Sequence, residues 1–198
     1  MIDLNNLKFI GNNLKRPECV LVDKEETLHV ADWRGGVTLI YKNGVQKTIL
    51  ANGSFKPKPN GIAIHPDGGW LLTHLGDNDG GVYRLSLNGD LKPYLLEINK
   101  ELLPPTNYVH IDNLGRVWIT VSTRLIPRIL GCTPNFKDGF IILIDENENG
   151  IWEIQVMDDD NDGNPDRAFL DNDEDKKIDA IAYDYDQDGT WDKFEEVS

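Results

Sequence analysis

Aspartate recurs at a fixed spacing in the last part of the sequence, where its carboxylates could bind a cation. From Asp145 onward the sequence repeats every 13 residues, and aspartate opens each copy, at positions 145, 158, 171 and 184. Oxygen-bearing side chains recur at repeat positions 1, 3, 5 and 9, and glycine stands at position 6 in three of the four copies. Alternate residues of a tight turn direct their oxygens inward, and glycine permits the sharp bend. The pattern therefore predicts turns that bind Ca²⁺.

The last copy satisfies the whole EF-hand loop pattern D-x-D-x-D-G-x5-E, which ends at Glu195. The 13-residue spacing leaves no room for flanking helices, so we expect short strands joined by calcium turns. This arrangement resembles the aspartate-rich calcium repeats of thrombospondin type 3 modules. The first copy and the third copy, where Lys176 replaces glycine, fit the pattern least well. The predicted ligands are Asp158, Asp160, Asp162, Asp166, Asp171, Asp173, Asp175, Asp179, Asp184, Asp186, Asp188, Asp192 and Glu195.

The charge of the chain divides at the same point. The net charge is −14, yet residues 145–198 hold 20 acidic and 4 basic residues, while the rest of the chain holds 14 acidic and 16 basic ones. We therefore expect two domains, residues 1–144 and residues 145–198. The acidity argues against a nucleic-acid partner, which needs a basic surface, and favours divalent cations. The alternative for the second domain is a solvated acidic tail that self-repulsion keeps disordered.

Three copies of a longer pattern precede the acidic repeats. Each copy opens on a polar residue, Glu18, Asn60 or Asn107, and continues with an alternating apolar strand, a turn rich in Asp, Asn and Gly, and further strands. The openers lie 42 and 47 residues apart, which is typical of β-propeller blades. The sequence thus predicts an all-β fold, a partial propeller of about three blades followed by a calcium-binding β-turn module. The segment LKFIG could add an edge strand, and the acidic module could grow from the outer hairpin of the third blade and shield its open edge.

The three polar openers would point at the axis of the propeller, because the first strand of each blade lines the central channel. Carboxylate and amide oxygens that converge there suit a hard divalent cation. The alternative is that these side chains cap turns at the beginning of a strand, which Asn does readily.

The strings RPECVLVDKEETLHVAD, PNGIAIHPDG and PPTNYVHIDNLGRVWITVSTRLIPR resemble the SMP-30/gluconolactonase/LRE-like family of six-bladed propellers, over roughly residues 8 to 146. Members of this family are typically lactonases whose Ca²⁺ or Zn²⁺ is held by a Glu, two Asn and an Asp. The resemblance implies that Glu18 and Asn107 are metal ligands and that Asn60 could face a small lactone substrate.

The second half of the family's pattern is absent after Ile144, so only two of its four metal ligands have a counterpart and no residue matches the catalytic Asp. Two hypotheses follow. The first is a calcium-binding protein that is related to these lactonases and is weakly active or inactive as a lone chain. The second is a metal-dependent lactone hydrolase that becomes active as a homo-oligomer, because two chains together would supply six blades.

Two cysteines, Cys19 and Cys132, do not form a disulfide framework. No apolar run has the length needed to span a membrane, and MIDLNNLKF lacks the features of a secretion signal, so we expect a soluble protein. The missing signal and unpaired cysteines slightly favour the cytoplasm, whereas calcium repeats favour the outside of the cell. These indications conflict, and the compartment stays open.

Overall fold

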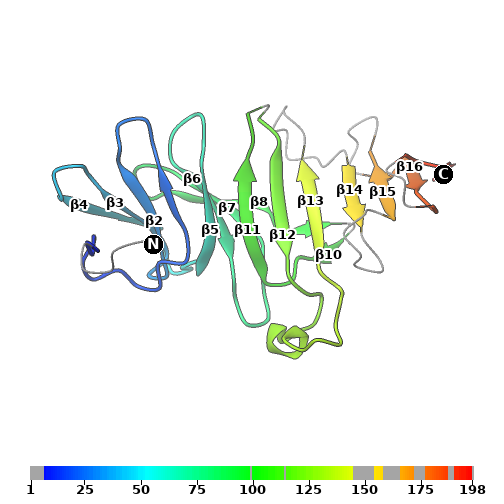
Figure 1. The fold of residues 1–198 in the computed structure, drawn as a ribbon, viewed down its shortest axis with the longest axis horizontal. Coiled ribbons are helices and arrows are strands. Elements are labelled where there is room, and N and C mark those ends of the chain that lie inside the picture. Colours follow the sequence, from blue (N-terminus) through cyan, green and yellow to red (C-terminus); the bar gives the residue numbers. More distant parts are fainter. Residues whose placement is uncertain are drawn as a thin grey trace.

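The computed structural model describes residues 7–98, 100–113, 115–144, 154–157, 166–171, 177–186 and 190–197, and for residues 154–156 it describes the backbone alone. Within these ranges the chain is all-β, apart from one 3₁₀ turn at Arg128–Gly131. Its antiparallel sheets stand side by side along the long axis of the molecule (Figure 1). The fold is a partial β-propeller, as the sequence predicts. No helix in the described part of the chain is long and apolar enough to cross a membrane.

The first two blades are four-stranded antiparallel sheets whose strands pair in chain order. The Asn-Gly pairs predicted as hairpin turns lie between the third and fourth strands of each blade, where Gly44 has φ 83° and Gly89 has φ 90°. These values need glycine's freedom in the left-handed region. The first blade contains β1 (Val20–Val22), β2 (Leu28–Asp32), β3 (Gly36–Ile40) and β4 (Gln46–Leu50), and the second contains β5 (Pro59–Ile64), β6 (Trp70–His74), β7 (Val82–Leu85) and β8 (Leu91–Leu95).

The third blade continues without a break into the acidic repeats, and together they form one seven-stranded sheet. The prediction that the acidic module grows from this blade's outer hairpin is therefore confirmed. The sequence-based boundary after residue 144 falls between two strands that pair directly, with Leu143 opposite Ile154. The strands, in order, are β11 (Thr106–Ile111), β12 (Val117–Val121), β13 (Phe140–Ile144), β14 (Ile154–Met157), β15 (Arg167–Leu170), β16 (Ala180–Tyr183) and β17 (Lys193–Glu196).

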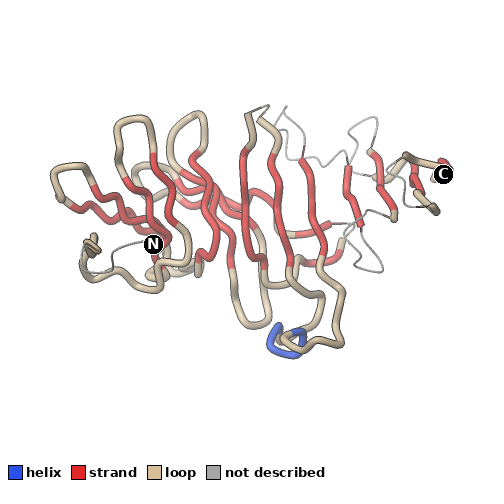
Figure 2. The backbone as a smooth tube through the Cα atoms, in the orientation of Figure 1, coloured by secondary structure: helices blue, strands red, loops and turns tan. Residues whose placement is uncertain are grey.

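Two shorter features complete the fold. A two-stranded hairpin, β9 (Glu97–Ile98) and β10 (Glu101–Leu102), lies in the linker between the second and third blades. The loop between β12 and β13, residues 122–139, extends away from the sheet and carries the 3₁₀ turn (Figure 2).

Two apolar clusters hold the three blades together. One cluster joins the facing sides of the first two blades and includes Val37, Ile62 and Trp70, and the other joins the second and third blades through Leu71 and Ile119 among others. The inner strands also approach closely, since a Cβ at Gly61 on β5 would lie 2.7 Å from the Cα of Tyr108 on β11. Apolar burial between neighbouring sheets, rather than ring closure, therefore holds this part of the chain together.

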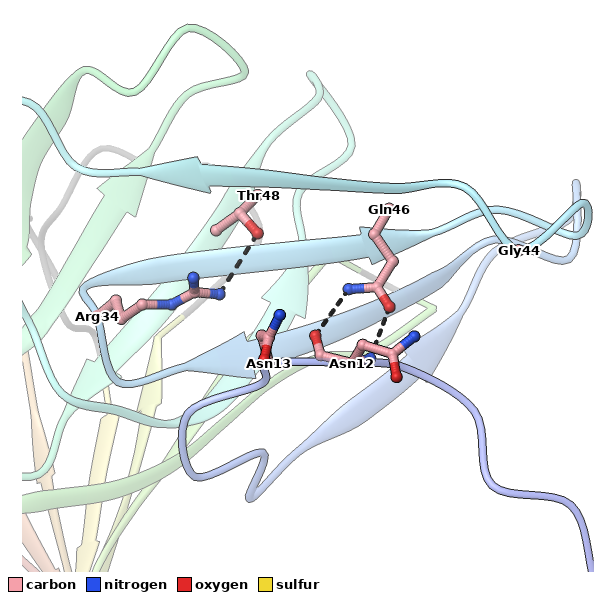
Figure 3. A pocket seen from close by; sticks show the side chains of 6 residues that line it. All are labelled: Asn12, Asn13, Arg34, Gly44, Gln46 and Thr48. Carbon is pink, nitrogen blue, oxygen red and sulfur yellow. Dashed lines mark hydrogen bonds between the residues drawn. The ribbon is translucent and has the colours of Figure 1, made fainter.

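The N-terminal residues 7–16, here called the strap, form no strand, so the expected edge strand at LKFIG is wrong. The strap instead lies along the hairpin of β3 and β4. The backbone N–H of Asn12 donates to Oε1 of Gln46 at 2.7 Å, and Nε2 of Gln46 donates to the carbonyl of Asn12 at 3.0 Å (Figure 3). Gly11 also approaches Ile40, because an added Cβ would lie 2.9 Å from Ile40 Cδ1. The strap thus covers part of the outer face of the first blade.

A buried hydrogen-bonded chain links the first two blades. Nε1 of Trp70 donates to Nδ1 of His29 at 2.8 Å, and Nε2 of His29 lies 3.0 Å from Oδ2 of Asp23. Because Nδ1 accepts a hydrogen bond, Nε2 carries the proton of the neutral ring and donates it to the carboxylate. Trp70 is 1% exposed, so this chain fixes a large core side chain in one orientation.

Trp70→Phe should lower the free energy of unfolding by about 2 kcal/mol, because His29 keeps a buried acceptor without its donor. Urea unfolding measures this loss. Trp191→Phe is the matched control, since Trp191 is 37% exposed and the change should stay within about 0.5 kcal/mol. Equal effects of the two substitutions would contradict the role given to the buried chain.

Candidate functional site

The acidic turns share one closing hydrogen bond. At the ninth position of a repeat, the backbone N–H of the aspartate donates to the carbonyl of the last residue of the preceding strand. This bond joins Asp166 to Met157 at 2.8 Å, Asp179 to Leu170 at 2.7 Å, and Asp192 to Tyr183 at 2.7 Å. The four-residue strands β14 to β17 begin 13 residues apart, so each repeat supplies one strand and one nine-residue turn. The expected combination of short strands and acidic turns is confirmed for the described residues.

The last turn gathers three carboxylates. Asp184, Asp186 and Asp192 each place a carboxylate oxygen so that these atoms all lie within 4.8 Å of one another. Asp184 is 3% exposed. Oδ2 of Asp192 also accepts the backbone N–H of Tyr185 at 2.7 Å, which orients this carboxylate across the turn. Three negative charges at this separation repel one another, and a divalent cation with oxygen ligands would neutralise them.

Backbone hydrogen bonds extend the pairing of the strands into the ends of the turns. The N–H of Asp184 donates to the carbonyl of Asp166 at 2.9 Å, and the N–H of Val197 donates to the carbonyl of Asp179 at 2.7 Å. Asp171 opens the third repeat as Asp184 opens the fourth, and it is likewise buried, at 1% exposure. The remaining predicted ligands, Asp158, Asp160, Asp162, Asp173, Asp175 and Asp188, lie outside the described residues.

Glu195 lies on β17 rather than in the turn. Its Oε2 accepts the hydroxyl of Tyr183 at 3.1 Å, and its Oε1 pairs with Nζ of Lys193. The ion pair with Lys193 and the Tyr183 hydrogen bond lower the pKa of the Glu195 carboxyl. The carboxylate group of the last turn does not include Glu195. Its role as a twelfth-position calcium ligand stays a prediction.

The structure brings two of the three predicted axial residues together. Nδ2 of Asn60 donates to the carbonyl of Asn107 at 3.2 Å and lies 3.3 Å from Asn107 Oδ1. Thr73 Oγ1 donates to the same carbonyl at 3.1 Å, so the start of β11 is tied to the second blade. Glu18, just before β1, makes an ion pair with Arg16.

These contacts do not fit the axial metal that the family resemblance implies. Oε1 of Glu18 already accepts from the guanidinium of Arg16, and Oδ1 of Asn107 already accepts from the amide of Asn60. Of the four ligands that the family resemblance implies, only two have a counterpart in this chain. We therefore derive no catalytic step through a metal at the axis.

The first blade holds an ion pair between the buried Asp32 and the partly exposed Arg34, beside an open pocket, which the sequence did not predict. Asp32 is 0% exposed, and Arg34 binds its carboxylate through Nε at 2.8 Å and Nη2 at 2.5 Å. Thr38 Oγ1 donates to Asp32 Oδ2 at 3.1 Å. Only the position of Asp32 at the end of the LHVAD strand hinted at this arrangement. A pocket of about 390 Å³ lies outside the pair, between the strap and the hairpin (Figure 3), lined by Asn12, Asn13, Arg34, Gly44, Gln46 and Thr48.

A scan against protein-family models and a comparison with curated proteins gave no match. Solved structures with a similar fold include a gluconolactonase from Xanthomonas campestris, with a TM-score of 0.51 and 13% identity over 87% of this chain and 58% of that chain. They also include virginiamycin B lyase from Staphylococcus aureus, with a TM-score of 0.45 and 15% identity over 83% of this chain and 50% of that one. The chain therefore spans between half and three fifths of the length of these structures, and at such identities the likeness concerns the fold alone.

The ion pair of the buried Asp32 carboxylate predicts a specific dependence of stability on pH. Burial raises the pKa of the Asp32 carboxyl, but the hydrogen bonds from Arg34 and Thr38 outweigh burial, so this pKa lies below its ordinary value of 3.8. Asp32 therefore adds stability above pH 3.8, and this contribution is lost as the pH falls through the folded-state pKa. Asp32→Asn should be less stable than wild type at pH 7, and its stability should fall less steeply below pH 3.8. Urea unfolding at several pH values checks this, and parallel curves would refute it.

Proposed function

We propose that this chain is a calcium-binding protein built on a partial propeller of the kind found in SMP-30/gluconolactonase-type lactonases, and that it has little or no lactonase activity alone. The observation that carries the proposal is the convergence of the Asp184, Asp186 and Asp192 carboxylates in the last turn. The repeated closing hydrogen bond supports the same role for the earlier turns, since each ends at an aspartate whose backbone N–H makes the same bond. The second module would comprise residues 145–198.

Calcium binding would act on the third blade as well as on the turns. The turns connect strands of the sheet to which β11, β12 and β13 belong. Repulsion among carboxylates in a turn opposes the approach of the two strands that it joins, and a bound cation removes this repulsion. Calcium therefore stabilises the sheet to which the third blade belongs.

The alternative is a lactone hydrolase that works as an oligomer. The fold of the gluconolactonase from Xanthomonas campestris supports this alternative, because this chain covers 58% of that protein and a second copy would supply further blades. Its substrate would be a small lactone, and its cofactor Ca²⁺ or Zn²⁺. The contacts of Glu18 and Asn107 favour the first proposal, because both side chains already have partners from this chain.

Removal of calcium should lower the melting temperature of the whole chain, including the signal from the propeller core. At a free calcium concentration of about 100 times the dissociation constant, one site adds about 2.7 kcal/mol, which corresponds to roughly 5–10 °C in a chain of this size. Differential scanning calorimetry with calcium and with a chelator measures the shift. An unchanged melt would count against the coupling of the turns to the third blade.

Asp192→Asn should weaken calcium binding at the last turn by about 10-fold or more, because it removes one of three converging carboxylate charges. Isothermal titration measures the affinity. Glu196→Gln is the matched control, since it removes one charge from the neighbouring strand β17 without touching the cluster. Equal losses in both variants would mean that general acidity, rather than a built site, attracts the cation.

A lactone hydrolysis assay with Ca²⁺ or Zn²⁺, paired with the mass in solution, separates the two functions. The first proposal expects a monomer with no turnover above background. Turnover by an oligomer that Glu18→Ala abolishes would establish the alternative instead.

A further inference from the structure

Arg16 makes a compact contact with the acidic residue at the start of the first blade. Its backbone has φ 48°, in the left-handed region that non-glycine residues rarely adopt, and its carbonyl accepts the N–H of Glu18 at 2.9 Å. This tight turn across Pro17 directs the guanidinium back to the Glu18 carboxylate, where Nε donates to Oε1. Arg16 therefore adopts an unfavourable backbone conformation, and this conformation places its positive charge beside Glu18.

An aromatic ring holds the same guanidinium from another side. The Cζ atom of Arg16 lies 3.8 Å from the ring centroid of Trp33, within the range of a cation–π contact. Nζ of Lys58 lies 5.8 Å from the same centroid, so a second positive charge stands nearby. Stacking and the ion pair together fix Arg16 more firmly than a surface ion pair alone would, since such pairs contribute little by themselves.

Asn107, the second residue of the implied metal site, also accepts a hydrogen bond from this chain. The amide of Asn60 lies 3.3 Å from Oδ1 of Asn107, the oxygen that a cation would need. The nitrogen of an amide or a guanidinium is a donor without an accessible lone pair, so neither group can join the ligand set of a metal. Both implied ligands therefore face donors from this chain.

We infer that Arg16 takes the place of the divalent cation that the family resemblance implies at Glu18, and that an internal ion pair neutralises this carboxylate. A guanidinium is always charged and offers several donors in a plane, so it balances a carboxylate without dehydrating an ion. A cation approaching Glu18 would meet the positive charge of Arg16 and would have to displace it. This inference concerns residues distant in sequence from the calcium turns, so it and the proposed function can fail independently.

The test counts bound divalent ions in the full chain after equilibration with Zn²⁺ or with Ca²⁺. Glu18→Gln should leave the metal content of wild type unchanged. Arg16→Gln should gain one equivalent per chain, and adding Glu18→Gln to it should remove that equivalent. Arg16→Lys keeps the charge and should gain none.

Arg116→Gln is the matched control, because Arg116 also pairs with a carboxylate, that of Asp112, and lies over a Trp ring at 5.4 Å. This variant should show the wild-type metal content.

A far-ultraviolet circular dichroism spectrum identical to that of wild type establishes that Arg16→Gln is folded. Loss of one equivalent from wild type on Glu18→Gln would overturn the inference, because Glu18 would then already bind a metal. A folded Arg16→Gln variant without a gain would overturn it as well, and so would a gain in Arg16→Lys. Asp192→Asn, which acts on the calcium turns, reports separately on the proposed function.

Discussion

Repulsion between carboxylates is the constraint on which the second half of this molecule depends. The sheet that begins as the third blade continues through β14 to β17, and an acidic turn connects each of these strands to the next. Backbone hydrogen bonds close the turns at their ninth position, and the bond from Asp184 to Asp166 joins aspartates of the fourth and second repeats. Strand pairing therefore brings like charges together in the turns, and their repulsion destabilises the sheet unless a cation balances the charge. Calcium suits this position because it accepts many oxygen ligands in a flexible geometry.

The first and the third blade, which form the two ends of the partial propeller, have different neighbouring segments. A complete ring would pack another blade against the face of each end blade, and an open end blade exposes that apolar face. At the first blade, the strap covers part of the outer face through contacts such as the one between Asn12 and Gln46. At the third blade, the sheet is instead extended at its outer edge by β14 to β17. These two features describe a chain whose three blades are held by inter-blade cores and extended by the acidic repeats.

Periodicity predicted most of this architecture. The spacing of Glu18, Asn60 and Asn107 gave the three blades, and the Asn-Gly pairs located two hairpin turns. The 13-residue repeat predicted the short strands and the turns between them. These features were accessible because each depends on local alternation and turn chemistry.

Contacts between distant residues were not accessible from the sequence. The polar residues at Glu18 and Asn107 suggested a metal site, but their actual neighbours, Arg16 and Asn60, depend on the backbone turn and on the packing of two blades. The ion pair of Asp32 with Arg34 was missed for a similar reason, since nothing in the local pattern shows that Asp32 is fully buried. Side-chain pairing and burial are decided by tertiary structure, so sequence patterns identify candidate oxygens without identifying what binds them.

Hydrogen exchange of the full chain with and without calcium tests the central claim most directly, because it reports on each strand separately. If calcium neutralises the acidic turns, backbone amides in β14 to β17 should exchange more slowly when calcium is present, and the protection should extend into β13. The amides of the first blade should change least. Equal exchange rates in β14 to β17 with and without calcium would contradict the account.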